Sequence, residues 1–286
     1  MLFPLFPAVV ALAATVSEGA GPLRSLVDAE SAFSRMSVEH GMRDAFLANL
    51  ADDGIVFQPL PVNGKSVWTP REPSKATLIW EPAFAEISAA GDLGYTTGPF
   101  ELRPPPEANR PIMHGSFHSV WRRAGDGPWK VAVDIGGLHD KLEPGVGSGA
   151  FDAGPAHEPA GKADRRKASE KEILEAEKHF SKAAEKDGFD KAFADVAAGD
   201  VRFSRSGKAP AVGLEAARGV LLGEGNVRWC PAGHGASRSG DLGYAYGVRE
   251  HIRASATPDT SVFLDVWRRE KGKWRLALAV DNPVQR

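Results

Sequence analysis

The chain has 286 residues, of which 42% are hydrophobic and 25% are charged, a composition typical of a globular protein long enough for two cores. Its 35 Lys and Arg residues are balanced by 37 Asp and Glu residues. This balance leaves no large positive field to hold a polyanion, so we expect no nucleic-acid partner. The single cysteine, Cys230, excludes an intramolecular disulfide, and we assign it no role.

The N-terminus begins with the uncharged apolar run MLFPLFPAVVALAATV, which has roughly the length of a signal peptide and is followed by small residues. The run is too short to span a bilayer, so no integral membrane segment is expected. We predict that residues 1–22 are a signal peptide or a disordered leader, which implies a periplasmic or secreted protein. If the leader is not a signal peptide, the protein is cytoplasmic.

The next residues have the spacing of an amphipathic helix, because Leu26, Phe33 and Met36 fall on one face of a helix with 3.6 residues per turn. The tripeptide EHG at 39–41 interrupts this pattern, and a glycine just past a helix end is a common stop signal. A second, short helix containing Phe46 is expected after it.

After residue 80 the pattern changes to runs of four to ten residues rich in Val, Phe, Trp, Tyr and Thr. Turn sequences such as GD and AGDG separate these runs, as in the hairpins of an antiparallel sheet. Helices followed by long strands predict an α+β domain over residues 23–139, with the helices packed on one face of a curved sheet to form a cone. Residues 140–169 are rich in Gly, Pro, Ala and charge and lack apolar periodicity, which predicts a flexible linker.

The second half of the chain repeats the first, at an offset that stays between 145 and 149 residues. The matching segments are GDLGY at 91–95 and 240–244, AESAFSR at 29–35 and AEKHFSK at 176–182, and WKVAV at 129–133 and WRLAL at 274–278. A nearly constant offset over a whole domain indicates a tandem duplication rather than a short-period repeat. We therefore expect a second copy of the unit over residues 170–286, and an internal pseudo-dimer.

The first copy carries a resemblance to a known family. WEPAFAEISAAGDLGYTTGPFELR followed by HGSFHSVWRRAGDGPWKVAVDIG resembles the nuclear transport factor 2-like superfamily, in its SnoaL-like branch of ketosteroid isomerase-like and polyketide cyclase-like domains. The resemblance implies two tandem cone-shaped domains, each with a pocket. Isomerases, cyclases, dehydratases and noncatalytic domains share this fold, so it leaves the activity open.

The pair His114 and His118 has the H-x3-H spacing of a zinc site only if it lies on a helix. Its sequence context favours a strand, in which four residues span about 13 Å, so the two imidazoles cannot bind one metal. Neither a metal nor any other cofactor is expected. The two histidines still share one face of the predicted strand with Ser116.

Comparison of the two copies places the chemistry in the first. Ser116 and His118 correspond to Val262 and Leu264 in copy two, and Asp134 corresponds to an alanine. We predict catalytic roles for Asp134 or His118 as the base and for Tyr95 as the hydrogen-bond donor to an enolate oxygen. The predicted ligand-binding residues are Trp80, Thr97, Ser116 and His114.

Structural roles are the alternative for these residues, because an Asp before a glycine pair often bonds a turn backbone and a Tyr on a strand is ordinary packing. The predicted function is an exported protein that binds a small hydrophobic carbonyl compound in two pockets, of which the second is more degenerate. The first pocket retains acid/base chemistry in this interpretation. The alternative is a noncatalytic interaction protein in which the duplication forms an internal pseudo-dimer.

Overall fold

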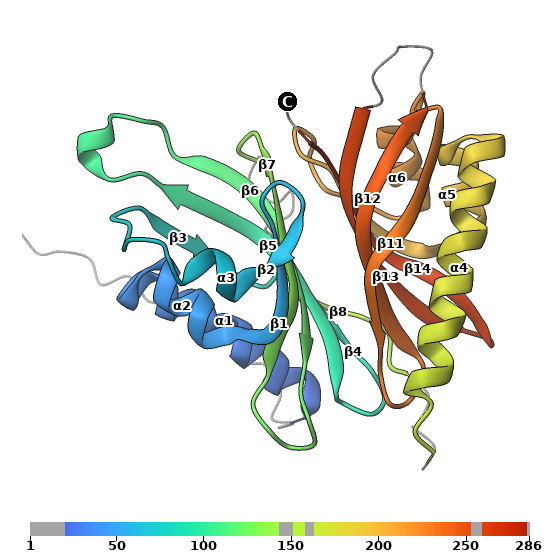
Figure 1. Cartoon of the computed structure of the whole chain (residues 1–286), viewed down its shortest axis with the longest axis horizontal. Coiled ribbons are helices and arrows are strands. Elements are labelled where there is room, and N and C mark those ends of the chain that lie inside the picture. The colour runs from blue at the N-terminus through green and yellow to red at the C-terminus, as the bar shows by residue number, and fades with distance from the viewer. Residues whose placement is uncertain (1–20, 143–150, 158–162, 253–258, 285–286) are drawn as a thin grey trace, which may run out of the picture.

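The computed structural model describes residues 21–142, 151–157, 163–252 and 259–284, so the expected leader lies almost entirely outside it. Figure 1 shows two domains, each with helices on one side of a sheet, and with the two sheets facing each other. The first domain contains α1 (Pro22–His40), α2 (Met42–Asn49), β1 (Leu50–Phe57), β2 (Pro61–Asn63), α3 (Gly64–Trp68), β3 (Thr77–Trp80), β4 (Phe84–Ile87), β5 (Leu93–Arg103), η1 (Pro106–Ala108), β6 (Met113–Arg122), β7 (Lys130–His139) and β8 (Asp152–Ala153). The second contains α4 (Arg166–Asp187), α5 (Phe189–Val196), β9 (Ala197–Ser204), β10 (Ala211–Val212), α6 (Leu214–Leu221), β11 (Asn226–Ala236), β12 (Leu242–Ile252), β13 (Asp259–Glu270) and β14 (Lys273–Pro283).

A glycine with positive φ separates the first two helices of each domain. Gly41 has φ of 87° between α1 and α2, and Gly188 has φ of 94° between α4 and α5. Glycine adopts this region without the steric cost that other residues incur. The predicted break at residues 39–41 and the short helix after it are therefore confirmed.

The two sheets have the same strand order. The first runs β2-β1-β7-β6-β5-β4-β8, with β3 also paired to β5, and the second runs β10-β9-β14-β13-β12-β11. Most neighbours are antiparallel as predicted, but β1 pairs in parallel with β7, and β9 with β14. This difference arises because β1 and β9 follow helices rather than hairpins, so each can enter the sheet beside its last strand in the same direction. The predicted α+β architecture of two helix-on-sheet domains is confirmed.

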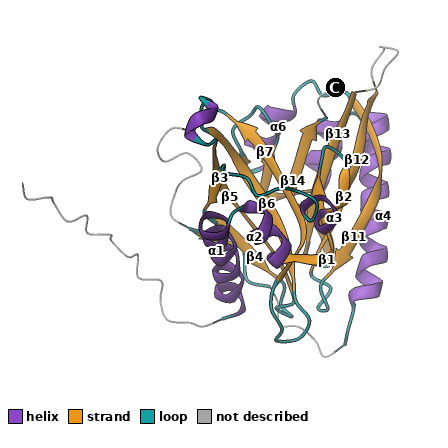
Figure 2. Ribbon diagram, turned by 60° about the vertical axis from the view of Figure 1, so that its left-hand side comes forward, coloured by secondary structure: helices purple, strands orange, loops and turns teal. Residues whose placement is uncertain are grey.

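Hydrophobic residues of the described segments form three cores. One lies between helices and sheet in each domain, and each contains a fully buried tryptophan of the matching segments, Trp121 or Trp267. The third core lies between the two sheets and includes Val120, Leu264 and Val280. Full burial of one such side chain stabilises the fold by about 1.5–3 kcal/mol. Figure 2, a second view, also shows the helices outside and the strands between them.

Two equivalent turns make the same contact in both directions across the interface. The backbone N–H of Ala89 donates to Asp241 Oδ2 at 2.8 Å, and the backbone N–H of Arg238 donates to Asp92 Oδ2 at 3.0 Å. A pair of reciprocal contacts is the mark of an isologous, two-fold interface. Both aspartates belong to the repeated GDLGY segment, so the repeated segment supplies the matching halves of this interface.

The segment expected to be a linker contributes to the fold. Residues 151–157 are described, and within them β8 runs parallel to β4, with Asp152 opposite Phe84. The second domain starts with α4 at Arg166, four residues before the predicted boundary. The connection between the domains therefore adds a strand to the first sheet and carries His157 to the interface.

Candidate functional site

Successive residues of β6 point to opposite sides of the first sheet. Phe117 belongs to the core under the helices, whereas Val120 belongs to the core between the sheets. Because side chains alternate along a strand, Ser119 shares the helix side with Phe117, and Ser116 and His118 face the second domain with Val120. We call the space enclosed by the sheet and helices of the first domain the first cone, and its counterpart the second cone.

Asp134 of β7 lies in the first cone directly opposite Ser119. The Ser119 hydroxyl donates to Asp134 Oδ2 at 2.8 Å. Asp134 is only partly buried, so some of its surface is accessible to solvent. Burial raises the pKa of Asp134 to about 7, against the lowering effect of the Ser119 hydrogen bond, and the nearby Glu30 carboxyl adds to the rise. At neutral pH this group therefore exists in both protonation states and can accept or give a proton.

A second carboxyl group lies deeper in the first cone. Glu30 of α1 is fully buried and accepts hydrogen bonds from Trp80 Nε1 at 2.5 Å, Thr96 Oγ1 at 2.5 Å and Trp121 Nε1 at 2.7 Å. Burial raises the pKa of Glu30, although these hydrogen bonds oppose the rise. Trp80, predicted to bind ligand, thus has a structural partner in Glu30.

Apolar side chains lie toward one end of the first sheet, where β6 begins and β7 ends. Met113 and Leu138 end strands on the same side as Asp134, and they are 36% and 47% exposed. The ring of Phe100 lies over Gly115, where an added Cβ would come within 2.4 Å of the ring atom Cζ. An aromatic ring over a glycine and two exposed aliphatic side chains give a surface suited to an apolar ligand.

Tyr95, the predicted enolate donor, lies on the other face of the sheet. Its hydroxyl donates to Glu86 Oε2 at 2.9 Å, and both side chains are buried. Burial raises the pKa of Tyr95 well above its usual value, and the Glu86 carboxylate raises it further. The structure therefore gives Tyr95 a partner between the domains rather than in the first cone.

His118 and its neighbours also lie between the domains. Thr97 Oγ1 is 2.8 Å from His118 Nδ1, and Ser116 Oγ is 2.9 Å from His139 Nε2. Burial lowers the pKa of His118 to about 3, with the charges of His139 and Arg202 lowering it further, so the ring is neutral. Within the described residues, His118 Nε2 is buried without a hydrogen-bond partner. His114 lies nearer the rim, with Nδ1 3.8 Å from Glu101.

The expectation that the polar face of Ser116 and His118 would line the first cone is corrected here. That face is covered by the second sheet, because both sheets have an apolar outer face that is removed from water when they pack together. In the sheet register His118 is opposite Ile135, whereas Asp134 is opposite Ser119. The structure therefore keeps Asp134 in the cone and separates it from both His118 and Tyr95.

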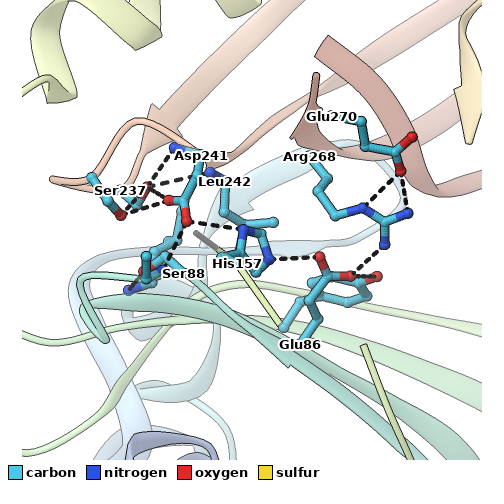
Figure 3. A network of polar contacts seen from close by, with 12 residues as sticks. Glu86, Ser88, His157, Ser237, Asp241, Leu242, Arg268 and Glu270 are labelled. Carbon is cyan, nitrogen blue, oxygen red and sulfur yellow. Dashed lines mark hydrogen bonds and ion pairs between the residues drawn. The ribbon is translucent and has the colours of Figure 1, made fainter. Parts of the chain in front are cut away.

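A network of charges also crosses the interface (Figure 3). His157 lies between Glu86 of the first domain and Asp241 of the second, with its ring nitrogens 2.9 Å from each carboxylate. Arg268 reaches from the second domain to Glu86 at 3.2 Å and also pairs with Asp200 and Glu270. These contacts join the two sheets at one side of the interface.

Sequence analysis missed the charged residues of the second cone. The guanidinium of Arg249 is fully buried, lies 4.3 Å and 4.6 Å from the ring centres of Phe263 and Trp229, and pairs with Asp265 and Asp281. Other polar residues complete the cluster: Glu177, Arg205, Glu224, His251 and Ser261. This buried network lies on the helix side of the second sheet, where Ala279 occupies the position of Asp134.

The offsets that revealed the repeat could have found this cluster. Arg249 occupies the position of Phe100, Asp265 that of Ser119, and Asp281 that of Gly136. These residues lie on the helix side of the sheet, whereas the sequence comparison concentrated on the alternate residues of the same strand. To find the cluster, the comparison had to be made on the side of each strand that faces the helices. The fully buried Trp121 and Trp267 lie on that side.

Within the described ranges, no cluster of His, Cys, Asp or Glu is arranged to hold a metal ion. The helices in those same ranges also include none with enough length and apolar character to cross a membrane. Residues of the first cone offer hydrogen-bonding and acid/base groups rather than a ligand set for a metal.

Comparison with known proteins finds no matching family model and no matching curated protein. Solved structures that are similar each cover about two fifths of the chain. They include an NTF2-like protein of unknown function from Pseudomonas putida KT2440, with 17% identity, 41% of this chain and 87% of that chain covered, and a TM-score of 0.35. A ketosteroid isomerase-like protein from Erwinia carotovora atroseptica SCRI1043 has 18% identity, coverage of 40% and 96%, and a TM-score of 0.35. An LEH-like epoxide hydrolase from M. tuberculosis has 15% identity, coverage of 40% and 79%, and a TM-score of 0.31.

Proposed function

We propose that the first domain binds a hydrophobic small molecule bearing a carbonyl or similar acceptor, and that Asp134 exchanges a proton with it. The observation that supports this most directly is Asp134 itself, a partly accessible carboxyl group on the helix side of the first sheet, whose pKa is raised by burial to about 7. A carboxyl group with a pKa near the working pH is suited to general acid/base catalysis. Isomerisation, cyclisation and dehydration of carbonyl compounds all need such a group.

The reaction requires removal of a proton from the carbon next to the carbonyl group. Asp134 in its ionised form takes that proton, and the Ser119 hydroxyl holds the carboxylate in place through its 2.8 Å hydrogen bond. A donor must then stabilise the oxygen on which negative charge develops. Trp68, whose buried indole N–H has no hydrogen-bond partner among the described residues, is our candidate.

The test is titration of the protein with a panel of steroid ketones and polyketide-like ketones, followed by tryptophan fluorescence and by assays for turnover. Asp134→Asn keeps the size of the side chain but cannot take the proton, so we expect binding with loss of turnover. Asp140→Asn, at an exposed position beyond the end of β7, is the control. Turnover that survives in Asp134→Asn, or no binding by the parent to any ketone, would contradict the proposal.

The noncatalytic interaction protein remains the second candidate, and the reciprocal interface is the observation that favours it. In that case the packing of the two sheets against each other would be the role of the protein, and the interior of each domain would serve only as a hydrophobic core.

We also propose that the two domains arose by tandem duplication, given their common strand order, and that residues 1–22 direct export. Intact-mass measurement of the protein from its native host tests export, since retention of Met1 in the soluble fraction would count against it.

A further inference from the structure

The two sides of the interdomain interface differ in one respect that points to a ligand. The pseudo-two-fold relation matches Tyr95 with Tyr244 and Arg268 with Arg122, because each pair holds the same place in the sheet register. Glu86, however, is matched by Gly235. One side of the interface therefore has a buried carboxylate between a tyrosine and an arginine, and the other side has the tyrosine and arginine alone.

The side with Glu86 shows how such a carboxylate is held. Glu86 Oε2 accepts the Tyr95 hydroxyl at 2.9 Å and Arg268 Nη1 at 3.2 Å, and Oε1 is 2.9 Å from His157 Nε2. Figure 3 shows Arg268 and His157 converging on Glu86 from two directions. Hydrogen bonds between charged partners in a buried place are stronger than neutral ones, so this arrangement is a built carboxylate site.

The side with Gly235 keeps the same donors without the acid. Among the described residues, Arg122 pairs with Asp53, the counterpart of Asp200, and is 43% exposed, whereas the buried Arg268 pairs with three carboxylates. The Tyr244 hydroxyl makes no hydrogen bond with another described residue, although the side chain is only 6% exposed. The Tyr244 ring lies over Gly235, where an added Cβ would come within 2.9 Å of the phenol oxygen.

A cleft opens at this side of the interface. Its volume is about 590 Å³, within the usual range for sites that bind small molecules. Arg122, Gly235 and Tyr244 line it, and a second hollow of about 240 Å³ that shares Arg122 and Tyr244 continues from it. Five Lys and Arg side chains line the cleft against three Asp and Glu side chains, so its field favours an anion.

The cleft also offers an apolar surface. Leu50, Leu93 and Ala236 line it together with the ring of Tyr244. An anion with a hydrocarbon or aromatic body would bury that body here, while its charged end meets Arg122. Inorganic anions would leave this surface uncovered.

We propose that the cleft is a binding site for a carboxylate-bearing small molecule, whose carboxylate binds Arg122 and the hydroxyl of Tyr244 from the cleft side of the tyrosine ring. The site lies between the sheets, on the opposite face of the first sheet from Asp134. It is therefore separate from the first cone, and its occupancy does not depend on the function proposed above. Because the ligand would contact both domains, its binding strengthens their association.

Calorimetric titration with benzoate and 4-phenylbutyrate tests this site, with benzamide and 4-phenylbutyramide as neutral analogues of the same shape. We expect the carboxylates to bind, the amides to bind at least tenfold more weakly, and the affinity to fall as salt is raised, since a charge-assisted hydrogen bond accounts for roughly tenfold or more. Arg122→Gln should weaken carboxylate binding roughly tenfold or more, and Tyr244→Phe by a smaller factor. The control Arg228→Gln removes an exposed arginine of β11 outside the cleft and should leave binding unchanged.

Three results would overturn the proposal. They are the absence of binding by either carboxylate to the parent protein, equal binding of carboxylate and amide, and carboxylate binding by Arg122→Gln that equals that of the parent. Unchanged circular dichroism and melting temperature establish that each variant is folded, and Tyr244→Phe, which keeps the ring, gives a second result if Arg122→Gln does not fold. Asp134→Asn should bind benzoate as the parent does, which separates this site from the cone.

Discussion

Asp92 and Asp241 lie in equivalent turns, and each accepts a backbone N–H from the turn that contains the other. The serine four residues before each aspartate donates to it, Ser88 at 3.1 Å and Ser237 at 2.8 Å. The GDLGY segment therefore occurs twice because both partners of a two-fold contact need it. The same relation allows each position of one domain to be compared with its counterpart in the other, as Glu86 with Gly235.

We predict that Asp241→Ala destabilises the protein more than Asp92→Ala. Each change leaves buried donors without an acceptor, at a cost of about 1–3 kcal/mol per group. Asp241 additionally binds His157, whereas Asp92 binds the half-exposed Arg166. Urea unfolding of the two single variants and the double variant measures the free energies of unfolding, and a double variant that equals the sum of the singles would count against coupling across the interface.

His157 should make stability depend on pH in the alkaline range. Burial opposes its protonation, but its hydrogen bonds to Asp241 and Glu86 outweigh burial and raise the pKa of His157 to about 9. The protonated ring then contributes stability fully below its unfolded pKa of about 6.5, and this contribution is lost as the pH rises toward 9. Thermal melts of the parent between pH 6 and 10 should show the loss, while His157→Gln should show a flatter profile. The exposed His179 gives the matched control His179→Gln, and an identical profile in all three proteins would contradict the assignment.

Asp134 should also make the folded protein less stable as the pH rises, but over a lower pH range than His157. Its pKa is raised from 3.8 to about 7, so the folded protein holds this proton more tightly and loses stability as the pH rises from about 4 to 7. Asp134→Asn removes that cost, and we expect it to increase the free energy of unfolding at pH 8 by about 1–3 kcal/mol while making little difference at pH 4. Urea unfolding at both pH values checks this. If Asp134→Asn is less stable than the parent at pH 8, the prediction is wrong, because the ionised carboxylate must then make favourable interactions in the folded state.

The second cone should behave as a structural ion cluster. Arg249→Met leaves Asp265 and Asp281 buried with less compensating charge, and removal of one partner from such a network costs about 3–5 kcal/mol. The double variant Arg249→Met with Asp265→Leu removes a partner as well, so it should be more stable than Arg249→Met alone. Stability of the two variants in guanidinium chloride decides the matter, since a double variant that is weaker than the single one would point to a role beyond charge pairing.

The sequence was sufficient for the helices, the sheets and the repeat, because these follow from local periodicity and from comparison of one half with the other. Phe33 and Phe46 fall on helix faces that are easily recognised, and they do pack in the first core. The face of a strand is harder to assign. Strand alternation groups Ser116 with His118, but only the cross-strand register shows that Asp134 pairs with Ser119, after an irregularity between Val120 and Trp121.

Two other features depend on tertiary packing. Nothing in residues 140–169 indicates that His157 would be buried between carboxylates, because the segment has the composition of a linker. The sequence likewise gives no sign that Glu86 and Gly235 differ in role. The difference is seen only in the structure, where the two sheets face each other and the surroundings of the two positions can be compared.

Methionine methyl groups offer the most direct test of the claim that the first domain binds a ligand in its cone. The chain has four methionines, Met1, Met36, Met42 and Met113, and the three described ones all belong to the first domain. With methyl-13C-methionine, titration with a ketone that binds should shift at least one of the Met36, Met42 and Met113 resonances, saturably, and Asp134→Asn should alter the pH dependence of that shift around pH 7. Binding that leaves all three resonances unmoved, or a shift with no dependence on pH near 7, would contradict the account.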